Sequence, residues 1–266
     1  MMFNVKVEDD GVAVMEIGDI TPESVRPLRA ALAEIVSDNS VKGVVVDCIT
    51  GLDTFRPDLA RLDEVEGLRS TLRKLETSGK PAVAAISGSA VGTVFEITLA
   101  CHVRIASDLS FIRLGLPGAA AGMLPGFGAT QRLPRMIGVK EAARILLEGE
   151  LLDAEKARAL GLISELVSAD KLVDHARQRV LDPSAIKVQP WDQKAFVMPG
   201  IAVHSPAGRR FFSEAAAAIR ANPSAGQIAA HTALNCLYRG LQRPIDSGLA
   251  LEAEEFSYWS QPSTVA

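Results

Sequence analysis

Three short apolar runs separated by helical segments constrain the fold of this chain more than any other feature. The runs cover residues 42–48, 81–86 and 103–106, and valine, alanine and isoleucine make up most of their apolar content. Apolar runs of this length without strict alternation are typical of strands buried on both faces. Helical patterns lie between them, at residues 59–78 and 94–101. This order of strand and helix predicts right-handed crossovers and a parallel sheet.

The two ends of the chain differ from this central part. Residues 5–8 and 12–17 have strand patterns on either side of Asp10-Gly11, a dipeptide typical of tight hairpin turns. After a glycine-rich passage at residues 115–128, most segments have helical patterns. The sequence therefore predicts an N-terminal hairpin joined to the sheet and a mostly helical C-terminal part.

The length of the chain favours one main core with an appended part, because 266 residues are many for one domain and few for two. We expect the core over residues 1–183 and a loop with helices over residues 184–266. Within the core, Asp153 is expected to cap a helix that Gly161 ends.

Composition excludes several classes of protein. A net charge of −4 provides no basic surface for nucleic acid. Cys48, Cys101 and Cys236 fit neither a disulfide framework nor a zinc site, and the histidines have no metal-ligand spacing. The longest apolar stretch begins at Pro81 and is interrupted at Ser87, so it is too short to span a membrane. With no secretory signal in the sequence, we expect a cytoplasmic protein with reduced, buried thiols and no metal.

The segment from residue 84 to residue 96 is the strongest candidate for chemistry. A buried strand ends in small residues and glycines, and a helix begins near Thr93. Backbone N–H groups at such a helix start can stabilise negative charge that develops on a carbonyl oxygen. Glu96 lies in the first helical turn, close enough to act on a neighbouring carbon. Taken alone, the pattern is more typical of a structural turn, because a carboxylate near a helix N-terminus is favourable anyway.

Two segments resemble the hallmarks of the crotonase, or enoyl-CoA hydratase/isomerase, superfamily. They are residues 80–92, before the helix that carries Glu96, and residues 115–135, with the string Gly-Met-Leu-Pro-Gly-Phe-Gly-Ala-Thr-Gln-Arg-Leu-Pro-Arg. Residues 100–106 and 190–196 are similar to the hydratase/isomerase domain of multifunctional fatty-acid β-oxidation proteins. The resemblance implies an α/β spiral of ββα units with a helical C-terminal subdomain.

The resemblance also implies a substrate and an assembly. The substrate is an acyl-CoA thioester, and no cofactor is needed beyond the CoA that the substrate carries. Relatives form homotrimers or hexamers, and in the multifunctional proteins a hydroxyacyl-CoA dehydrogenase domain follows. Such a dehydrogenase is therefore a possible partner of this chain.

The family pattern assigns roles to residues of this sequence and finds two of them altered. Glu96 corresponds to the catalytic base, and the Thr93 amide, next to Gly92, to an oxyanion donor in the substrate site. The second catalytic glutamate falls on Gly118, which cannot transfer a proton. General acid–base assistance is typically worth about 10²–10⁴-fold, so hydration by the usual route is expected to suffer.

The second oxyanion donor falls in a loop that is shorter than in typical relatives. The family motif aligns with residues 56–58, which places the donor at Pro57 and substrate contact at Asp58. Proline has no N–H group, and the loss of one donor typically costs about 10²–10³-fold. Three functions follow from the resemblance: an enoyl-CoA hydratase, a one-carboxylate enoyl-CoA isomerase that uses Glu96 alone, and a non-catalytic relative that binds acyl-CoA or a partner.

Two further polar features of the sequence have a structural interpretation. His102 follows the end of the predicted helix at residues 94–101, where a packing role is the commoner one. Thr130-Gln131-Arg132 is predicted to begin a helix and to fix local geometry.

Overall fold

The computed structural model describes residues 3–49, 62–222 and 226–260. Contacts divide the chain into two compact units, which are described separately. The first unit consists of Met1–Leu114 and Leu152–Gln193, and the second of Gly115–Leu151 and Lys194–Ala266. Each unit thus consists of two separate segments of the chain. The sequence analysis expected one boundary, after residue 183, and that boundary stays a prediction.

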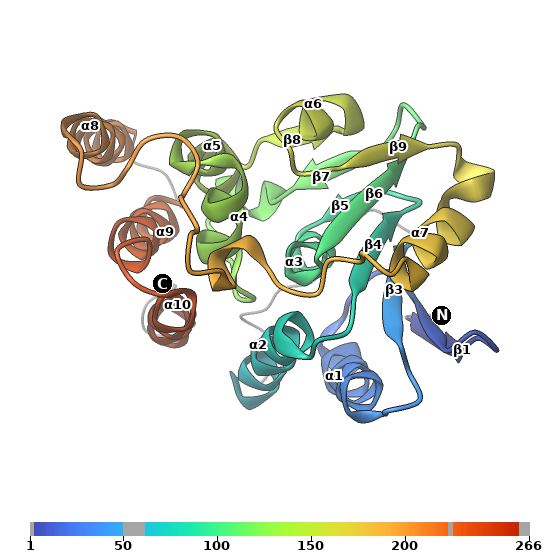
Figure 1. The fold of residues 1–266 in the computed structure, drawn as a ribbon. Helices are drawn as coiled ribbons and strands as arrows, with labels where there is room; N and C mark the ends of the chain where they lie inside the picture. Colours follow the sequence, from blue (N-terminus) through green and yellow to red (C-terminus); the bar gives the residue numbers. More distant parts are fainter. Residues whose placement is uncertain (1–2, 50–61, 223–225, 261–266) are drawn as a thin grey trace. The chain divides into compact units, whose positions relative to one another are not determined.

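The first unit is built on a six-stranded sheet with the order β1-β2-β3-β4-β6-β9 (Figure 1). The strands are β1 (Phe3–Val7), β2 (Val12–Ile17), β3 (Gly43–Cys48), β4 (Ala82–Ile86), β6 (Val103–Ser107) and β9 (Glu165–Val167). β1 and β2 form the expected hairpin and are antiparallel; every later pair is parallel. The parallel sheet predicted from the apolar runs is confirmed.

A second, three-stranded sheet has the order β5-β7-β8. Its strands are β5 (Ala90–Val91), β7 (Arg113–Gly115) and β8 (Leu151–Asp153). β5 lies between β4 and the next helix along the chain, in the segment singled out for chemistry.

Helices of the first unit cover the six-stranded sheet. They are α1 (Pro22–Ser37), α2 (Leu62–Thr77), α3 (Thr93–Ala100), α6 (Ala154–Ala159) and α7 (Leu172–Leu181), with single 3-10 turns η3 (Ala169–Lys171) and η4 (Pro190–Asp192). α1 and α2 lie side by side in both views, and α7 packs on β3, β4 and β6. Valines of the sheet, such as Val45 and Val83, form a buried cluster with Leu172, Ala176 and Val180 of α7.

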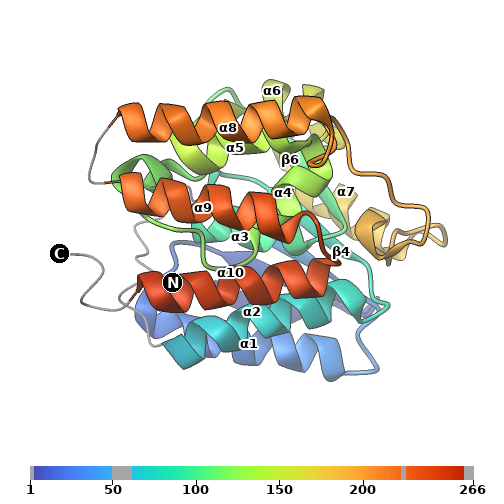
Figure 2. The same cartoon turned by 90° about the vertical axis from the view of Figure 1, so that its left-hand side faces the viewer.

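The second unit is helical. It contains η2 (Pro117–Ala121), α4 (Ala129–Ile137), α5 (Val139–Glu148), α8 (Pro206–Ala221), α9 (Gln227–Gly240) and α10 (Ile245–Trp259). α9 packs on α4, α5, α8 and α10, and Figure 2 shows α8, α9 and α10 as three neighbouring rods. The helical C-terminal part predicted from the sequence is confirmed. Among the described residues, no helix has the length and apolar character needed to cross a membrane.

Candidate functional site

The turn between β4 and α3 brings together three of the predicted site residues. Gly92 precedes α3 with φ 60° and ψ −128°, a backbone conformation that side chains rarely adopt. α3 begins at Thr93, and the backbone N–H of Glu96 closes the first turn onto the Gly92 carbonyl at 3.0 Å. Thr93 and Glu96 are each only 3% exposed. The predicted helix start is therefore confirmed, and it places a carboxylate in a buried first turn.

The loop before this turn is attached to the neighbouring strand β3. The N–H of Gly88 donates to the Cys48 carbonyl at 2.7 Å, and the Ser87 hydroxyl donates to the carboxylate of Asp47. Burial raises the pKa of Asp47 above its usual range, and nearby Glu16 raises it further, against the lowering effect of the Ser87 bond. Asp47 thus restrains the loop that leads to α3, a role that its place within an apolar run did not reveal.

His102 has the structural role that the sequence predicts. Its Nδ1 accepts a hydrogen bond from the Ala82 N–H at 3.1 Å, and its Nε2 lies 3.1 Å from the carbonyl oxygen of Glu76. This pattern requires a neutral ring with the proton on Nε2. Burial also lowers the pKa of His102. The side chain joins β4 to α2.

Gly118 lies in the second unit, in η2, where the chain ends a 3-10 turn in a Schellman arrangement. Gly122 adopts φ 85°, its N–H donates to the Ala119 carbonyl at 3.0 Å, and the Met123 N–H donates to the Gly118 carbonyl at 2.9 Å. In this motif the residue at the position of Met123 packs over the residue at the position of Gly118. A Cβ atom added at Gly118 would lie 2.1 Å from Met123 Cε. The space beside Gly118 is therefore filled by a thioether methyl.

The loop with the predicted second oxyanion donor, Pro57, and the predicted contact Asp58 lies outside the described residues. Among the residues that are described, no group of three or more His, Cys, Asp or Glu side chains could hold a metal ion. The three cysteines are buried and form no disulfide with one another.

Thr130-Gln131-Arg132 begins α4, as predicted, and these side chains are fully buried in the second unit. The carboxylate of Glu252, on α10, accepts hydrogen bonds from the N–H groups of Gly128 at 2.6 Å and Thr130 at 3.0 Å, and also from the Thr130 hydroxyl. Gln131 Nε2 donates to the carbonyl of Cys236 at 3.1 Å. The structural interpretation of this string is confirmed, because its polar groups join α4 to α9 and α10.

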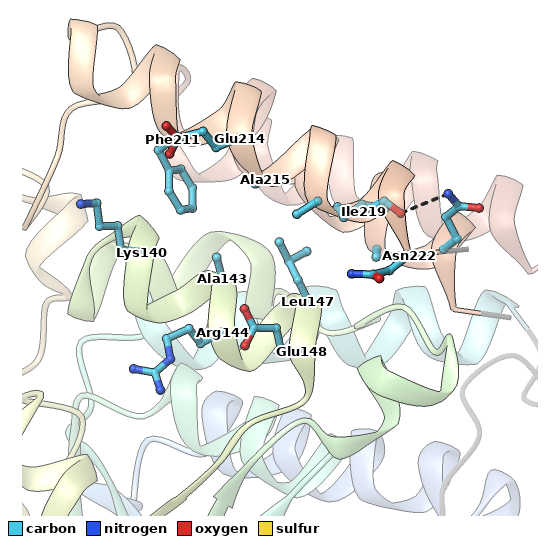
Figure 3. A pocket seen from close by; sticks show the side chains of 13 residues that line it. Lys140, Ala143, Arg144, Leu147, Glu148, Phe211, Glu214, Ala215, Ile219 and Asn222 are labelled. Carbon is cyan, nitrogen blue, oxygen red and sulfur yellow. Dashed lines mark hydrogen bonds between the residues drawn. The ribbon is translucent and has the colours of Figure 1, made fainter. Parts of the chain in front are cut away.

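A hollow of about 530 Å³ lies between α5 and α8 in the second unit (Figure 3). Its apolar lining includes Leu147, Phe211 and Ile219, and charged side chains such as Lys140 and Glu148 lie at its rim. Of the predicted site residues that the structure describes, Gly92, Thr93, Glu96 and Gly118, none lines it.

Comparison with known proteins identifies relatives along nearly the whole chain. The family model described as enoyl-CoA hydratase/isomerase matches residues 16–185. The fatty acid oxidation complex subunit alpha of Vibrio vulnificus is 32% identical over 274 residues, which cover 96% of this chain and 38% of that protein. Its counterpart in Idiomarina loihiensis is 38% identical over 198 residues, covering 67% and 28%. The chain therefore spans about 38% or less of the length of these relatives.

Solved structures show the same fold. The crystal structure of an enoyl-CoA hydratase from Mycobacterium avium subsp. paratuberculosis aligns with a TM-score of 0.66 at 22% identity and covers 100% of this chain and 93% of that one. Pseudomonas aeruginosa DspI aligns with a TM-score of 0.58 at 24% identity, covering 80% and 91%. The fold expected from the sequence, an α/β core with a helical C-terminal subdomain, is confirmed.

Proposed function

The chain belongs to the enoyl-CoA hydratase/isomerase family, and on this premise we propose that it binds an acyl-CoA thioester and acts on it through the carboxylate of Glu96. The observation that carries the proposal is the buried first turn of α3, where Gly92 follows β5, Thr93 begins the helix and Glu96 completes its first turn. Family membership supports a hydratase or an isomerase reaction. The proposed roles are those of the family pattern: Glu96 as the base and the Thr93 amide as an oxyanion donor.

In hydration, Glu96 takes a proton from water while the water oxygen bonds to C3 of a 2-enoyl thioester. Negative charge develops on the thioester oxygen, where the N–H of Thr93 stabilises it. C2 then needs a proton, which relatives obtain from the glutamate that corresponds to Gly118. Because glycine has no carboxyl group, this proton must come from another group.

A second candidate function, double-bond isomerisation, is favoured by that observation at Gly118. Glu96 takes a proton from C2 of a 3-enoyl thioester, the charge passes to the thioester oxygen, and the same carboxyl returns the proton to C4. The product is the conjugated 2-enoyl thioester, and no second acid is required. One buried carboxylate is enough for this reaction.

The assembly, location and partners remain part of the proposal. The relatives are named as subunits of a fatty acid oxidation complex, which supports a role in fatty-acid metabolism. A hydroxyacyl-CoA dehydrogenase is proposed as a partner from the resemblance to multifunctional β-oxidation proteins. A homotrimer or hexamer without a cofactor of its own is proposed from family resemblance, and a cytoplasmic location is proposed as well. Light scattering of the purified chain tests the assembly, and a monodisperse monomer contradicts it.

The activity is tested with two substrates and one matched control. Hydration of crotonyl-CoA is followed by loss of the conjugated thioester absorbance, and isomerisation of 3-hexenoyl-CoA by its gain. We expect Glu96→Gln to lower kcat by about 10²-fold or more. Glu66→Gln, an exposed glutamate on α2, serves as the control. Binding of butyryl-CoA without turnover of either substrate would leave a non-catalytic acyl-CoA-binding protein.

A further inference from the structure

The C-terminal end of α3 is bound by a buried arginine from the sheet. Arg104, in β6, is 8% exposed, and its Nη1 donates to the carbonyl oxygens of Thr98 at 3.2 Å and Cys101 at 2.7 Å. Its Nε donates to the Leu162 carbonyl at 2.7 Å, just after α6. Burial lowers the pKa of this guanidinium. Arg104 therefore donates these hydrogen bonds to backbone carbonyls, two of them at the end of α3.

A second buried side chain reaches the same end of α3 from a distant part of the sequence. Gln189 is 1% exposed, and its Nε2 donates to the carbonyl oxygens of Cys101 at 3.1 Å and Ala100 at 3.3 Å. The segment that carries Gln189 is attached to α2, because Asp192 accepts two bonds from Arg73, at 2.6 and 2.8 Å. The bonds between Arg73 and Asp192 thus help to hold the segment that carries Gln189 in place.

These contacts do more than fill the core. The last carbonyls of a helix have no partner within the helix, and a cation at that end is favourable for the helix dipole. Burying a guanidinium carries a desolvation cost that an apolar side chain would avoid. α3 has only 8 residues, and Ala100 lies one turn beyond Glu96. A shift at the bound end therefore moves the carboxylate of Glu96 as well.

We infer that Arg104 and Gln189 are positioning residues: they hold the C-terminal carbonyls of α3 and so fix the place of Glu96 in its first turn. The inference rests on the proposed function of Glu96 for its catalytic consequence. The claim that these two side chains hold the end of α3 rests on the hydrogen bonds alone. A misplacement of about 1 Å can cost 10²-fold in rate, so even a small loosening of α3 is measurable.

The first test compares Gln189→Leu with Gln193→Leu. Both change glutamine to leucine in the same segment, but Gln193 is exposed. We expect Gln189→Leu to lower kcat by about 10–10²-fold with KM changed less than about twofold, and to speed amide hydrogen exchange at residues 92–101. Exchange in α7 serves as the internal reference. Equal kcat and equal exchange in the two variants would overturn the inference.

The second test is rescue at Arg104, which guards against a variant that fails to fold. Arg104→Lys keeps the charge and one donor group for the α3 carbonyls, whereas Arg104→Met keeps only the volume. We expect kcat to be highest in the wild type, lower in Arg104→Lys and lowest in Arg104→Met. Amide hydrogen exchange in α3 should be slowest in the wild type and fastest in Arg104→Met. If the wild-type chain turns over neither substrate, the proposed function fails, and exchange alone decides the inference: faster exchange in the variants supports it, and unchanged exchange overturns it.

Discussion

The buried carboxylate of Glu252 offers a stringent test of how the second unit is held together. It is fully buried and accepts bonds from two backbone N–H groups and one hydroxyl at the start of α4. In Glu252→Gln one carboxylate oxygen becomes an NH₂ group, which cannot accept. One N–H group, of Gly128 or of Thr130, then loses its partner without access to water.

The magnitude follows from two contributions. A hydrogen bond to a charged group is worth about 1.5–3 kcal/mol. Negative charge at a helix N-terminus adds about 0.3–1 kcal/mol, or more when it is buried. We expect the free energy of unfolding to fall by about 2–4 kcal/mol, and Tm by about 4–16 °C for a domain of this size. Urea titration and calorimetry measure the two quantities.

Glu254→Gln is the matched control, because Glu254 lies on the same helix and is exposed. It is expected to change Tm by less than about 2 °C. If Glu252→Gln were neutral or stabilising, the desolvation cost of the buried charge would exceed the energy of its bonds, and the reasoning about α4 would be wrong.

Three further predictions concern packing, protonation and the missing acid. Gly248→Ala would place a Cβ 2.3 Å from the buried Oε1 of Gln131, and unfolding titrations should show a loss of about 1–3 kcal/mol despite the better helix propensity of alanine. Burial lowers the pKa of His102 in the folded state, so its contribution to stability is present above about pH 6.5 and lost as the pH falls. His102→Gln should therefore weaken the dependence of the free energy of unfolding on pH below about pH 6.5, and an unchanged dependence would contradict this reasoning. Gly118→Glu restores a carboxyl group at the position of the second family glutamate, and the flexible end of the Met123 side chain beside it can move away, so crotonyl-CoA hydration should rise at least tenfold. An unchanged rate would contradict the role proposed for this position.

Several features of the chain were predictable because their causes are local. The apolar runs at residues 42–48 and 81–86 became β3 and β4, since short uninterrupted valine- and alanine-rich runs favour strands buried on both faces. Asp153 caps α6, its carboxylate accepting from the Lys156 N–H at 2.7 Å, because an aspartate before a helical pattern can satisfy a free N–H group. Gly92 and Glu96 were placed in one turn for the same reason: they are neighbours in the chain.

Other features required the tertiary structure, because their partners are far apart in sequence. Glu252 meets Thr130 across 122 residues, and Gln189 meets Cys101 across 88. Neither pairing leaves a periodic pattern or a motif in the chain. From the sequence, Glu252 would be expected to be a charge that faces solvent on a helix. Gln189 would be expected to belong to an exposed loop, because prolines surround it.

The sequence was thus enough to predict β1, β2, β3, β4 and β6, the turn before α3 and the family of the protein, since each depends on residues that are close together or on a long specific string. The tertiary structure alone decided which polar side chains are buried and what they bind. Burial of a charged or amide group is tolerated only when distant backbone groups supply its hydrogen bonds, and those partners exist only once the chain has folded.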